Sequence, residues 1–415
     1  MSEFFNVLPP DEARALLLRH ITHVLPPERI KTEAALGRVL AAAIPAPSPL
    51  PAFRRSTMDG YAVRAADTYG ASASLPAFVT VVAEVAMGRP ATVLLRTGEV
   101  VIVHTGGMIP DSADAVIPVE HTQDMGGTDR FPHEIELLKA VAVGENVLQV
   151  GEDVRQGAEI LPARHWLRPQ DLGGLLALGI TEVEVVMRPR VALLATGDEV
   201  IYPAHTPIPG QIRDINSYTT AGQTIQAGGE PVLCGIVGDD YEALRNAAAS
   251  ALATHDMLVM SAGSSVSVRD MTVDVINSLG QPGVLLHGVA TRPGKPTIVG
   301  VVEGKPVLGL PGNPVSAMIQ FDMFGVPAIG RLLGAKMGVG RGRVLAQLTK
   351  NIASESGRED YVPARLEETS SGLFATPVFG KSNLIYTLVN ADGLIKVPLN
   401  KAGLEAGEWV EVRLF

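Results

Sequence analysis

The sequence predicts a multidomain protein that combines α/β and β folds, and three observations support this fold class. The chain has 415 residues, and at about 150 residues per domain this length predicts two to four domains. Apolar strand patterns alternate with helical patterns from residue 189 to about 333. Short strand patterns separated by glycine turns fill residues 53–145 and the segment after residue 338.

The first half of the chain predicts a discontinuous domain with a β domain inserted in it. Residues 11–24 place apolar side chains at helical spacing after acidic residues, which predicts an amphipathic helix. The alternate prolines of residues 44–52 exclude a helix and predict a stiff connector. After the β-rich stretch, a helix and a strand are predicted over residues 169–186. We therefore expect residues 1–50 and 145–187 to form one domain, and residues 51–144 to form the insert.

The second half predicts an α/β domain over residues 188–335 and a C-terminal β domain over residues 336–415. Uninterrupted apolar strands separated by helices are typical of a parallel sheet that is covered on both faces, as in a doubly wound fold. The candidate strands are residues 190–196, 231–237, 256–262 and 306–311, and the candidate helices are residues 215–228, 241–253, 273–280 and 314–324.

Composition limits the partners and the compartment. The formal net charge of −10 argues against a general nucleic-acid binder, which needs a basic surface. Cys234 is the only cysteine, so a disulfide within the chain and a zinc site built from cysteines are both excluded. The N-terminus lacks the pattern of a signal peptide, and no apolar run approaches the ~20 residues of a membrane span. We expect a cytoplasmic protein without a membrane or nucleic-acid partner.

Carboxylates follow the predicted strands of the α/β domain, where a doubly wound fold binds its ligands. Glu199 follows the strand of residues 190–196, Asp239 follows that of residues 231–237, and Asp270 comes soon after the third strand. Each acid also has a simpler explanation, since Gly-Asp pairs are common in turns. In particular, Asp239 and Asp240 could cap the helix predicted at residues 241–253.

Groups suited to an anion lie in the same loops. Asn313 is expected to cap a helix that Pro314 begins, and such a helix end attracts oxyanions. Because acids would repel a phosphate bound beside them, the combination predicts Mg²⁺ between the carboxylates and the phosphate oxygens. The candidate anion-binding residues are Gly263, Ser264, Ser265, Arg292, Lys295, Pro311, Gly312, Asn313 and Pro314.

The predicted β insert and the segment after it contain further candidates. Asp59 lies in a charged turn, Thr105 follows a strand, and Asp153 follows Gly151. Acids outside the α/β domain predict a site formed between domains or between subunits. The sequence shows no Ser-His-Asp nucleophile arrangement, no GxGxxG after a strand and no P-loop motif, which disfavours dinucleotide and P-loop nucleotide binding.

On these residues the chain resembles the molybdopterin molybdenumtransferase family, which includes bacterial MoeA and the E domain of gephyrin. The matching motifs occur in order and span residues 56–317. They are SxMDGYA (56–62), TGGMIPxxADAVIPVE (105–120), GEDV (151–154), ATGDEV (195–200), DINS (214–217), GDD (238–240), SAGSSVSVRD (261–270), RPGKP (292–296) and GLPGNPVSA (309–317).

The resemblance implies a central MogA-like α/β domain, an elongated homodimer and an active cleft between subunits. It also implies a reaction that takes adenylylated molybdopterin and molybdate, releases AMP and leaves molybdenum on the dithiolene sulfurs. By motif, Glu199, Asp239 and Asp270 would be the α/β acids and the metal ligands, with Arg292, Lys295 and the turn 311–314 facing oxyanions. Asp59, Thr105 and Asp153 would come from the partner-side domains.

Two other functions stay open from the sequence. Related α/β domains adenylylate molybdopterin, although the multidomain plan favours the later transferase step. A non-catalytic scaffold of the gephyrin kind is the third possibility, and the chain lacks the long disordered linker that scaffolds use. The loop SAGSSVS departs from the common SGGVSVG through Ala262, Ser264 and Ser267, so the resemblance does not fix the path of this loop or its ligand contacts.

Overall fold

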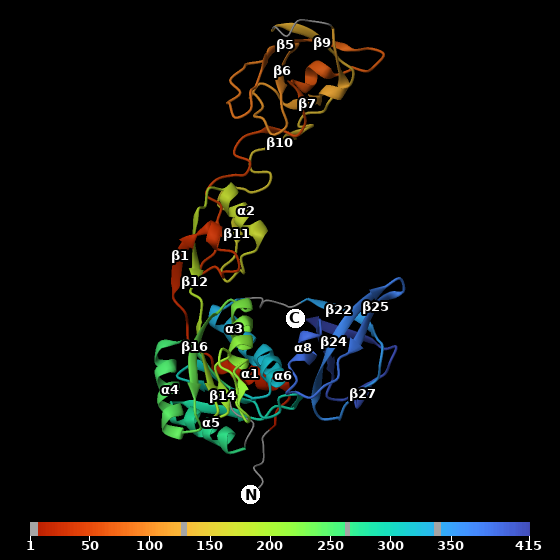
Figure 1. The fold of residues 1–415 in the computed structure, drawn as a ribbon. Coiled ribbons are helices and arrows are strands. Elements are labelled where there is room, and N and C mark those ends of the chain that lie inside the picture. Colours follow the sequence, from red (N-terminus) through yellow and green to blue (C-terminus); the bar gives the residue numbers. More distant parts are fainter. Residues whose placement is uncertain (1–6, 126–130, 262–265, 336–341) are drawn as a thin grey trace. The chain divides into compact units, whose positions relative to one another are not determined.

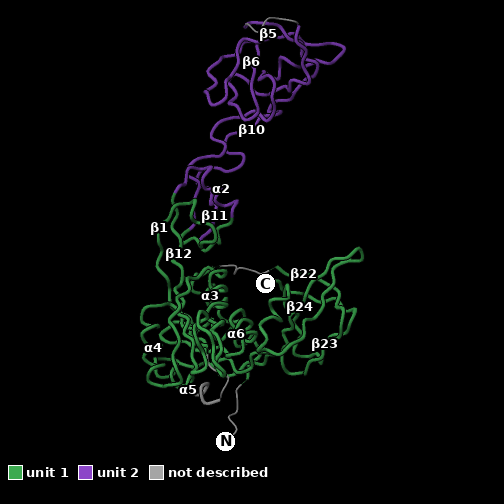
Figure 2. The backbone as a smooth tube through the Cα atoms, in the orientation of Figure 1, with its two compact units in different colours: residues 1–42, 164–168, 182–415 green, residues 43–163, 169–181 purple. Residues whose placement is uncertain are grey.

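The computed structural model describes residues 7–125, 131–261, 266–335 and 342–415, with the backbone alone for residues 266–270. The chain forms two compact units. Unit 1 consists of Met1–Ala42, Arg164–Arg168 and Glu182–Phe415, and unit 2 consists of Ala43–Ala163 and Pro169–Thr181 (Figure 2). The four-domain division expected from the sequence is finer than this and stays a prediction.

Unit 1 is built around a six-stranded sheet with the strand order β16-β13-β17-β21-β20-β18. The first four strands run parallel to one another, and β20 and β18 are each antiparallel to their neighbours. The parallel part confirms the prediction, whereas the last two strands were not predicted. The bounds are β13 (Arg190–Thr196), β16 (Glu230–Val237), β17 (Met257–Ser261), β18 (Pro282–His287), β20 (Ile298–Val302) and β21 (Lys305–Leu310).

Helices cover both faces of this sheet (Figure 1). Val191 and Val259 face a core that includes Leu17 of the N-terminal helix, while Ala192 faces the opposite core beside Leu244. The helices are α1 (Pro10–His20), α3 (Asn216–Gln226), α4 (Tyr241–Thr254), α5 (Val266–Ser278), α6 (Pro314–Gln320) and α7 (Val326–Leu333). A π-helical turn, η4 (Phe321–Gly325), joins α6 to α7, so one continuous helical segment runs from Pro314 to Leu333.

The C-terminal part of unit 1 is a small barrel. Five strands pair in the order β24-β25-β22-β28-β26, and a further pairing of β24 with β26 closes the ring. A short strand from the α/β part, β19 (Thr291–Arg292), adds to β24 in parallel. The barrel strands are β22 (Arg343–Leu348), β24 (Glu359–Thr369), β25 (Gly372–Pro377), β26 (Gly393–Val397) and β28 (Trp409–Leu414).

Shorter elements complete unit 1. β1 pairs antiparallel with β12, so residues that are 151 to 159 positions apart in the sequence lie side by side. A short helix, α8, follows β25. The bounds are β1 (Pro27–Lys31), η1 (Thr32–Ala34), β12 (Glu182–Val186), β14 (Val200–Ile201), β15 (Ile212–Arg213), β23 (Ile352–Ala353), α8 (Tyr386–Val389) and β27 (Gly403–Leu404).

Unit 2 contains a six-stranded sheet with the order β7-β4-β6-β5-β9-β8 and two small antiparallel pairs. The sheet agrees with the mostly β insert predicted from the sequence. Its strands are β4 (Gly60–Val63), β5 (Ala77–Glu84), β6 (Glu99–Val103), β7 (Ala115–Pro118), β8 (Thr122–Asp124) and β9 (His133–Leu137). The remaining elements are β2 (Ile44–Pro45), β3 (Arg55–Ser56), η2 (Ala65–Thr68), η3 (Val119–His121), β10 (Val147–Leu148), β11 (Glu159–Leu161) and α2 (Pro169–Ala177).

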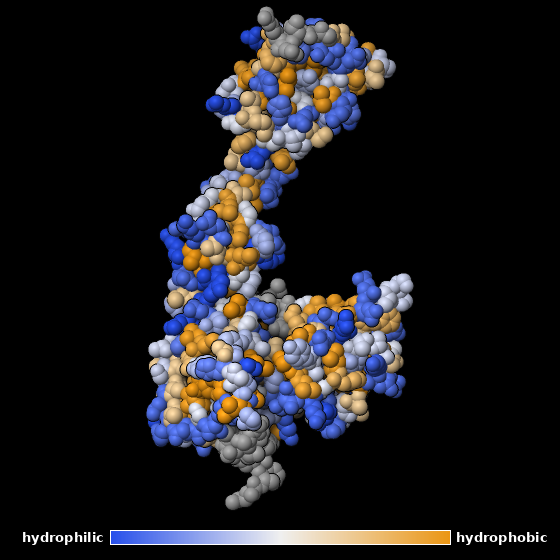
Figure 3. Space-filling model, in the orientation of Figure 1, coloured by the Kyte–Doolittle hydropathy of each residue, from blue (hydrophilic) through white to orange (hydrophobic). Residues whose placement is uncertain are grey.

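Apolar and hydrophilic side chains are interspersed over the visible face of each unit (Figure 3). Among the helices of the described residues, none combines the length and the apolar character needed to cross a bilayer. Isolated exposed apolar residues are normal on a folded protein.

Candidate functional site

Five strands of unit 1 end at one edge of the six-stranded sheet. The parallel strands β13, β16, β17 and β21 all end at this edge. β18 runs in the direction of β21 because both are antiparallel to β20, so the connection from β18 to β20 starts there too. Of the predicted residues, Glu199, Asp239 and the turn 311–314 follow strands that end at this edge, where α/β folds bind ligands.

Carboxylates occupy the β16–β13 half of this edge. The backbone N–H of Asp239 donates to Oδ1 of Asp198 at 3.1 Å. Burial, followed by the negative charges of Asp198 and Glu199, raises the pKa of Asp239 above its ordinary value of 3.8. Asp198 and Glu199 are thus close enough to Asp239 to act on its carboxylate. Gly197 has a φ of +130°, and a Cβ there would lie 2.7 Å from Oε2 of Glu199, so this turn requires glycine.

Asp240 and Asp239 have different roles, which resolves an alternative that the sequence left open. The side chain of Asp240 caps α4, accepting a hydrogen bond from the backbone N–H of Ala243 at 2.7 Å. Asp239 takes no part in this cap, so its carboxylate is available to a ligand. Helix capping therefore explains Asp240 and does not explain Asp239.

The predicted metal ligands can be located only in part. Glu199 and Asp239 lie at the same half of the edge, as described above. Asp270 belongs to α5, but its side chain lies outside the described part of the structure, and so do Gly263, Ser264 and Ser265. Within the described residues, no group of three or more His, Cys, Asp or Glu side chains is arranged to hold a metal ion.

The turn 311–314 follows β21 at the other half of the edge. Asn313 stands at the N-cap position of α6 and Pro314 begins the helix, as predicted, but the Asn313 side chain makes no capping hydrogen bond. Its Nδ2 instead donates to Oγ of Ser382 at 2.9 Å. The carbonyl of Gly312 accepts from Nδ2 of Asn216 at 2.9 Å. Tertiary partners on both sides therefore fix this turn.

Arg292 and Lys295 belong to the connection between β18 and β20. Nη1 of Arg292 lies 3.7 Å from Oδ2 of Asp360, a buried carboxylate on β24. Nε of Arg358 donates to the other oxygen of the same carboxylate at 3.0 Å. A single acid thus holds two guanidinium groups. The buried side chain of Gln320 donates to the carbonyl of Pro293 at 2.9 Å and fixes the turn between Arg292 and Lys295.

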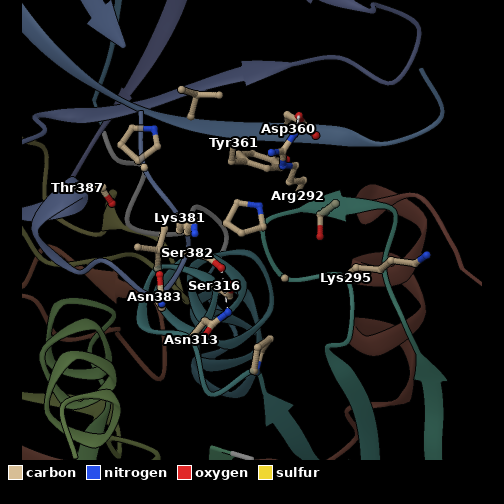
Figure 4. A pocket seen from close by; sticks show the side chains of 18 of the residues that line it. Arg292, Lys295, Asn313, Ser316, Asp360, Tyr361, Lys381, Ser382, Asn383 and Thr387 are labelled. Atoms are coloured by element: carbon tan, nitrogen blue, oxygen red, sulfur yellow. Dashed lines mark hydrogen bonds and ion pairs between the residues drawn. The ribbon is translucent and has the colours of Figure 1, made fainter. Parts of the chain in front are cut away.

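These groups line a cavity of about 760 Å³, which we call the basic pocket. Besides Arg292, Lys295, Pro311 and Asn313, it is lined by barrel residues and by the loop between β25 and α8. In Figure 4, Lys381, Ser382 and Asn383 gather near Asn313 and Ser316, whereas the Lys295 side chain extends away from them. Four cationic side chains line this cavity, Arg292, Lys295, Arg358 and Lys381, against the carboxylate of Asp360.

Sequence analysis missed the barrel's contribution to this pocket. Arg358, Asp360, Lys381 and Ser382 lie beyond the last motif that the sequence pointed to. The stretch FGKSN at residues 379–383 combines glycine with donor side chains, which suits anion binding. That composition is common in loops, and only the fold brings it to Asn313.

In unit 2 the structure brings two predicted residues together. Oδ1 of Asp59 accepts a hydrogen bond from the backbone N–H of Thr105 at 2.9 Å. Nδ1 of His104 lies 3.8 Å from the same oxygen, and its Nε2 lies 2.8 Å from Oε1 of Glu84. The motif residues Asp59 and Thr105 thus form one local cluster on the exposed surface of this unit.

Asp153 lies elsewhere in unit 2. Its backbone N–H donates to the carbonyl of Leu50 at 3.0 Å, and its side chain lines a cavity of about 620 Å³. Glu152 and Arg155 line the same cavity. Between the described residues of this unit, no hydrogen bond or ion pair joins Asp153 to Asp59.

Comparison with known families gives three matches that follow one another along the chain. Residues 8–179 match the "MoeA N-terminal region (domain I and II)". Residues 192–331 match a family described as "Probable molybdopterin binding domain". Residues 345–415 match the "MoeA C-terminal region (domain IV)". The second match covers the six-stranded sheet with the edge described above, and the third covers the barrel.

Individual relatives match over almost their whole length. Molybdopterin molybdenumtransferase 2 of Mycobacterium tuberculosis is 32% identical over 93% of this chain and 94% of its own length. Molybdopterin molybdenumtransferase of Bacillus subtilis is 31% identical over 100% of this chain and 95% of its own. The crystal structure of the molybdopterin biosynthesis MoeA protein from Pyrococcus horikoshii OT3 is 31% identical, with a TM-score of 0.85 over 99% of this chain and 100% of that one.

Proposed function

The chain belongs to the molybdopterin molybdenumtransferase (MoeA) family, and we propose that it inserts molybdenum into molybdopterin during molybdenum cofactor biosynthesis. Relatives that carry this enzyme's name match the barrel and unit 2 as well as the α/β part. The match over the whole length favours the transferase over an adenylyltransferase or a non-catalytic scaffold. The observation that supports this function most directly is that one edge of the sheet contains both the basic pocket and the carboxylates of Asp239 and Glu199.

The basic pocket is proposed to bind molybdate. Molybdate is a dianion with four oxygens, and guanidinium and ammonium groups form charge-assisted hydrogen bonds to such oxygens. Four cationic side chains face one carboxylate in the lining, which leaves an excess of positive charge. The hydroxyl of Ser382 and the amide of Asn313 add neutral donors at hydrogen-bonding distance from each other. Arg358 and Lys381 extend the set that was predicted from the sequence.

The carboxylate half of the edge is proposed to hold Mg²⁺ through Glu199, Asp239 and Asp270. The oxygens of Asp239 and Glu199 are the hard donors that Mg²⁺ prefers, and burial together with the charges of Asp198 and Glu199 raises the pKa of Asp239. Mg²⁺ usually keeps several waters and takes only one or two protein carboxylates, with the substrate phosphates supplying further oxygens. The described acids therefore fit this ion although they do not form a complete cage. When bound, Mg²⁺ would neutralise the oxygens of a pyrophosphate group.

The chain's own residues then account for the reaction that the resemblance implies. Water adds across the phosphoanhydride of adenylylated molybdopterin, which leaves AMP and the pterin phosphate. Molybdate binds the two dithiolene sulfurs, and the two thiol protons leave with one of its oxo groups as water. Breaking this bond requires stabilisation of developing negative charge more than a strong nucleophile. Arg292, Arg358 and Lys381 orient molybdate, while Glu199 and Asp239 position the phosphate end of the other substrate. No serine or cysteine nucleophile is required.

We further propose a cytoplasmic homodimer in which a second copy supplies Asp59, Thr105 and Asp153. The resemblance implies this arrangement, and the hydrogen bond between Asp59 and Thr105 supports a common role for these two residues. Mixed dimers of Glu199→Gln and Asp59→Asn chains test it. If the two groups come from different copies, each mixed dimer regains one intact site and about half of the activity. An inactive mixture, or a monomer in light scattering, would refute the arrangement.

The central test uses Glu199→Gln with adenylylated molybdopterin, molybdate and Mg²⁺. Gln keeps the size of the side chain and removes its charge, so insertion should be lost while pterin binding survives. Glu242→Gln is the matched control, because Glu242 lies exposed on α4 and forms a long ion pair with Arg245 at 3.7 Å. Full activity of Glu199→Gln would overturn the assignment. Adenylylated product from molybdopterin and Mg-ATP would instead favour the adenylyltransferase.

A further inference from the structure

A second cationic cavity lies in unit 1 and shares no residue with the basic pocket. It has a volume of about 480 Å³, and we call it the arginine cavity. Four arginines from separate elements line it, namely Arg14 of α1, Arg331 of α7, Arg343 of β22 and Arg413 of β28. Asp322 and Trp166 also line it. None of these six residues belongs to a motif used for the proposed transferase reaction.

The π-helical turn η4 helps to build this cavity. It places Asp322 in the cavity wall with only 4% of its surface exposed, where the carboxylate forms an ion pair with Arg413 of the barrel. π-Helical turns within α-helices are rare and occur frequently at functional sites. The continuous segment 314–333 thus lines the basic pocket at its beginning and the arginine cavity in its second half.

The charges in the arginine cavity are not balanced by its own lining. Four guanidinium groups face the single carboxylate of Asp322. Arg14 and Arg343 have ion pairs with Asp11 and Glu411 at 2.8 and 3.0 Å, but those acids are exposed and lie outside the lining. Exposed pairs of this kind are weak, so both guanidinium groups can turn to a ligand.

Arg331, unlike Arg14 and Arg343, has no ion pair with a described residue that a ligand would have to replace. It lies exposed in the last turn of α7, and in the described part of the chain it forms no ion pair. Its guanidinium group is therefore not engaged by a described acid and can pair with an anion that enters the cavity. A cavity in which like charges converge has a strongly positive potential until such an anion binds.

One wall of the cavity is apolar and rigid. Trp166 contributes its indole ring, with Leu18, Met323 and Pro327 beside it. The ring packs against Gly228, where an added Cβ would lie 2.7 Å from Cη2, so the tryptophan has little room to move. Aromatic and apolar walls bind the flat or apolar body of a small molecule, while charged groups fix its polar end.

We propose that the arginine cavity binds an organic phosphate, with the phosphate held by Arg331, Arg343 and Arg14 and the ring or apolar body against Trp166. Arginine is suited to phosphate because its planar fork donates two parallel hydrogen bonds. The volume of about 480 Å³ lies within the range of small-molecule sites. This site is separate from the proposed molybdate pocket and uses different residues.

The test uses Trp166 as an internal reporter. The chain has two tryptophans, and Trp409→Phe removes the other one, which is 65% exposed on β28. This variant is titrated with phenyl phosphate, inorganic phosphate and phenol at constant ionic strength. We expect a saturable change in Trp166 fluorescence with phenyl phosphate, a weaker affinity for inorganic phosphate, and no response to phenol. Equal affinities for the two phosphates would overturn the role of the apolar wall.

Variants separate this site from the basic pocket. Arg331→Gln with Arg343→Gln, in the Trp409→Phe background, should weaken phenyl phosphate by roughly tenfold or more, since each charge-assisted bond contributes about tenfold. Arg245→Gln on α4 is the matched surface control, and Arg292→Gln tests the other pocket; both should keep the Trp166 response. The Arg331, Arg343 variant should retain molybdenum insertion. An unsaturable response, unchanged affinity in that variant, or loss of the response in Arg292→Gln would each refute the proposal.

Discussion

The side-chain amide of Asn313 donates to the hydroxyl of Ser382 across 2.9 Å, joining a turn of the α/β sheet to the C-terminal barrel region. The backbone reinforces this link, because the N–H of Val315 donates to the carbonyl of Ser382 at 3.1 Å. Asn313 and Ser382 both line the basic pocket. The barrel is therefore part of the wall of this pocket, and not an appendage of the α/β part.

Removal of the Ser382 hydroxyl should impair oxyanion binding without unfolding the chain. Ser382→Ala deletes one donor and leaves Asn313 without its partner, which costs about 1 kcal/mol in stability. The backbone hydrogen bond to Val315 remains, so the loop keeps its position. We expect the KM for molybdate in metal insertion to rise roughly fivefold to tenfold. Ser371→Ala, an exposed hydroxyl in the turn between β24 and β25, is the control, and an unchanged KM in Ser382→Ala would contradict the pocket assignment.

Arg292 should contribute through its charge more than through the stability of the fold. Its side chain is 63% exposed, and its ion pair with Asp360 is long, at 3.7 Å. Arg292→Gln should therefore raise the KM for molybdate by about tenfold while the melting temperature stays unchanged. Arg292→Lys keeps the charge and changes the geometry, so a rise of less than about threefold is expected. If Arg292→Gln has the KM of the wild type, Arg292 does not contact molybdate.

Local sequence patterns predicted the parallel strands well and located the polar residues that follow them. Continuous apolar runs and the helices between them are local features, and β13 is found at the predicted residues 190–196. The antiparallel strands β18 and β20 were missed, since Gly283 and Gly300 interrupt their apolar runs. The acids at residues 198, 199 and 239 could be assigned to one edge because parallel strands must end together.

Contacts between distant segments could not be predicted in this way. Ser382 is 69 residues away from Asn313, and no periodic pattern links the two. The closure of the barrel by β24 and β26, and the addition of β19 to β24, are likewise set by tertiary packing. For the same reason the position of Asn313 at the helix start was predicted but its hydrogen bond was not, since its amide donates to Ser382 in the barrel region instead of capping the helix.

The raised pKa of Asp239 predicts a pH dependence of stability in the magnesium-free protein. A raised pKa means that the folded state binds the proton more tightly than the unfolded state. The free energy of unfolding should therefore fall as pH rises from about 3.8 through the raised pKa, and then level off. The side chain of Asp239→Asn cannot ionise, so this variant should have a higher melting temperature than the wild type above this pH window. The check is the melting temperature of both proteins measured as a function of pH.

Asp240→Asn is the matched control for this experiment. Asn caps helices as well as Asp does, so the cap of α4 should persist and the pH slope of the wild type should remain. Added Mg²⁺ should raise the melting temperature of the wild type and have little effect on Asp239→Asn. Identical pH slopes in the wild type and Asp239→Asn would show that burial and the neighbouring carboxylates do not raise the pKa of Asp239.

Gly60, in the motif SxMDGYA, should be irreplaceable for a steric reason in unit 2. β4 approaches β7 so closely at this point that an added Cβ would lie 2.0 Å from the carbonyl oxygen of Ile117. This neighbour is backbone and cannot move aside without breaking the pairing of Gly60 with Pro118. Gly60→Ala should therefore lower the free energy of unfolding of unit 2 by at least about 2 kcal/mol and displace the adjacent Asp59.

Gly173→Ala is the matched control in the same unit, because this helical glycine has open space around its Cβ position. Its free energy of unfolding should rise by roughly 0.5–1 kcal/mol. Differential scanning calorimetry separates the two variants, and a Gly60→Ala protein that melts with the wild type would show that the strands can part without cost.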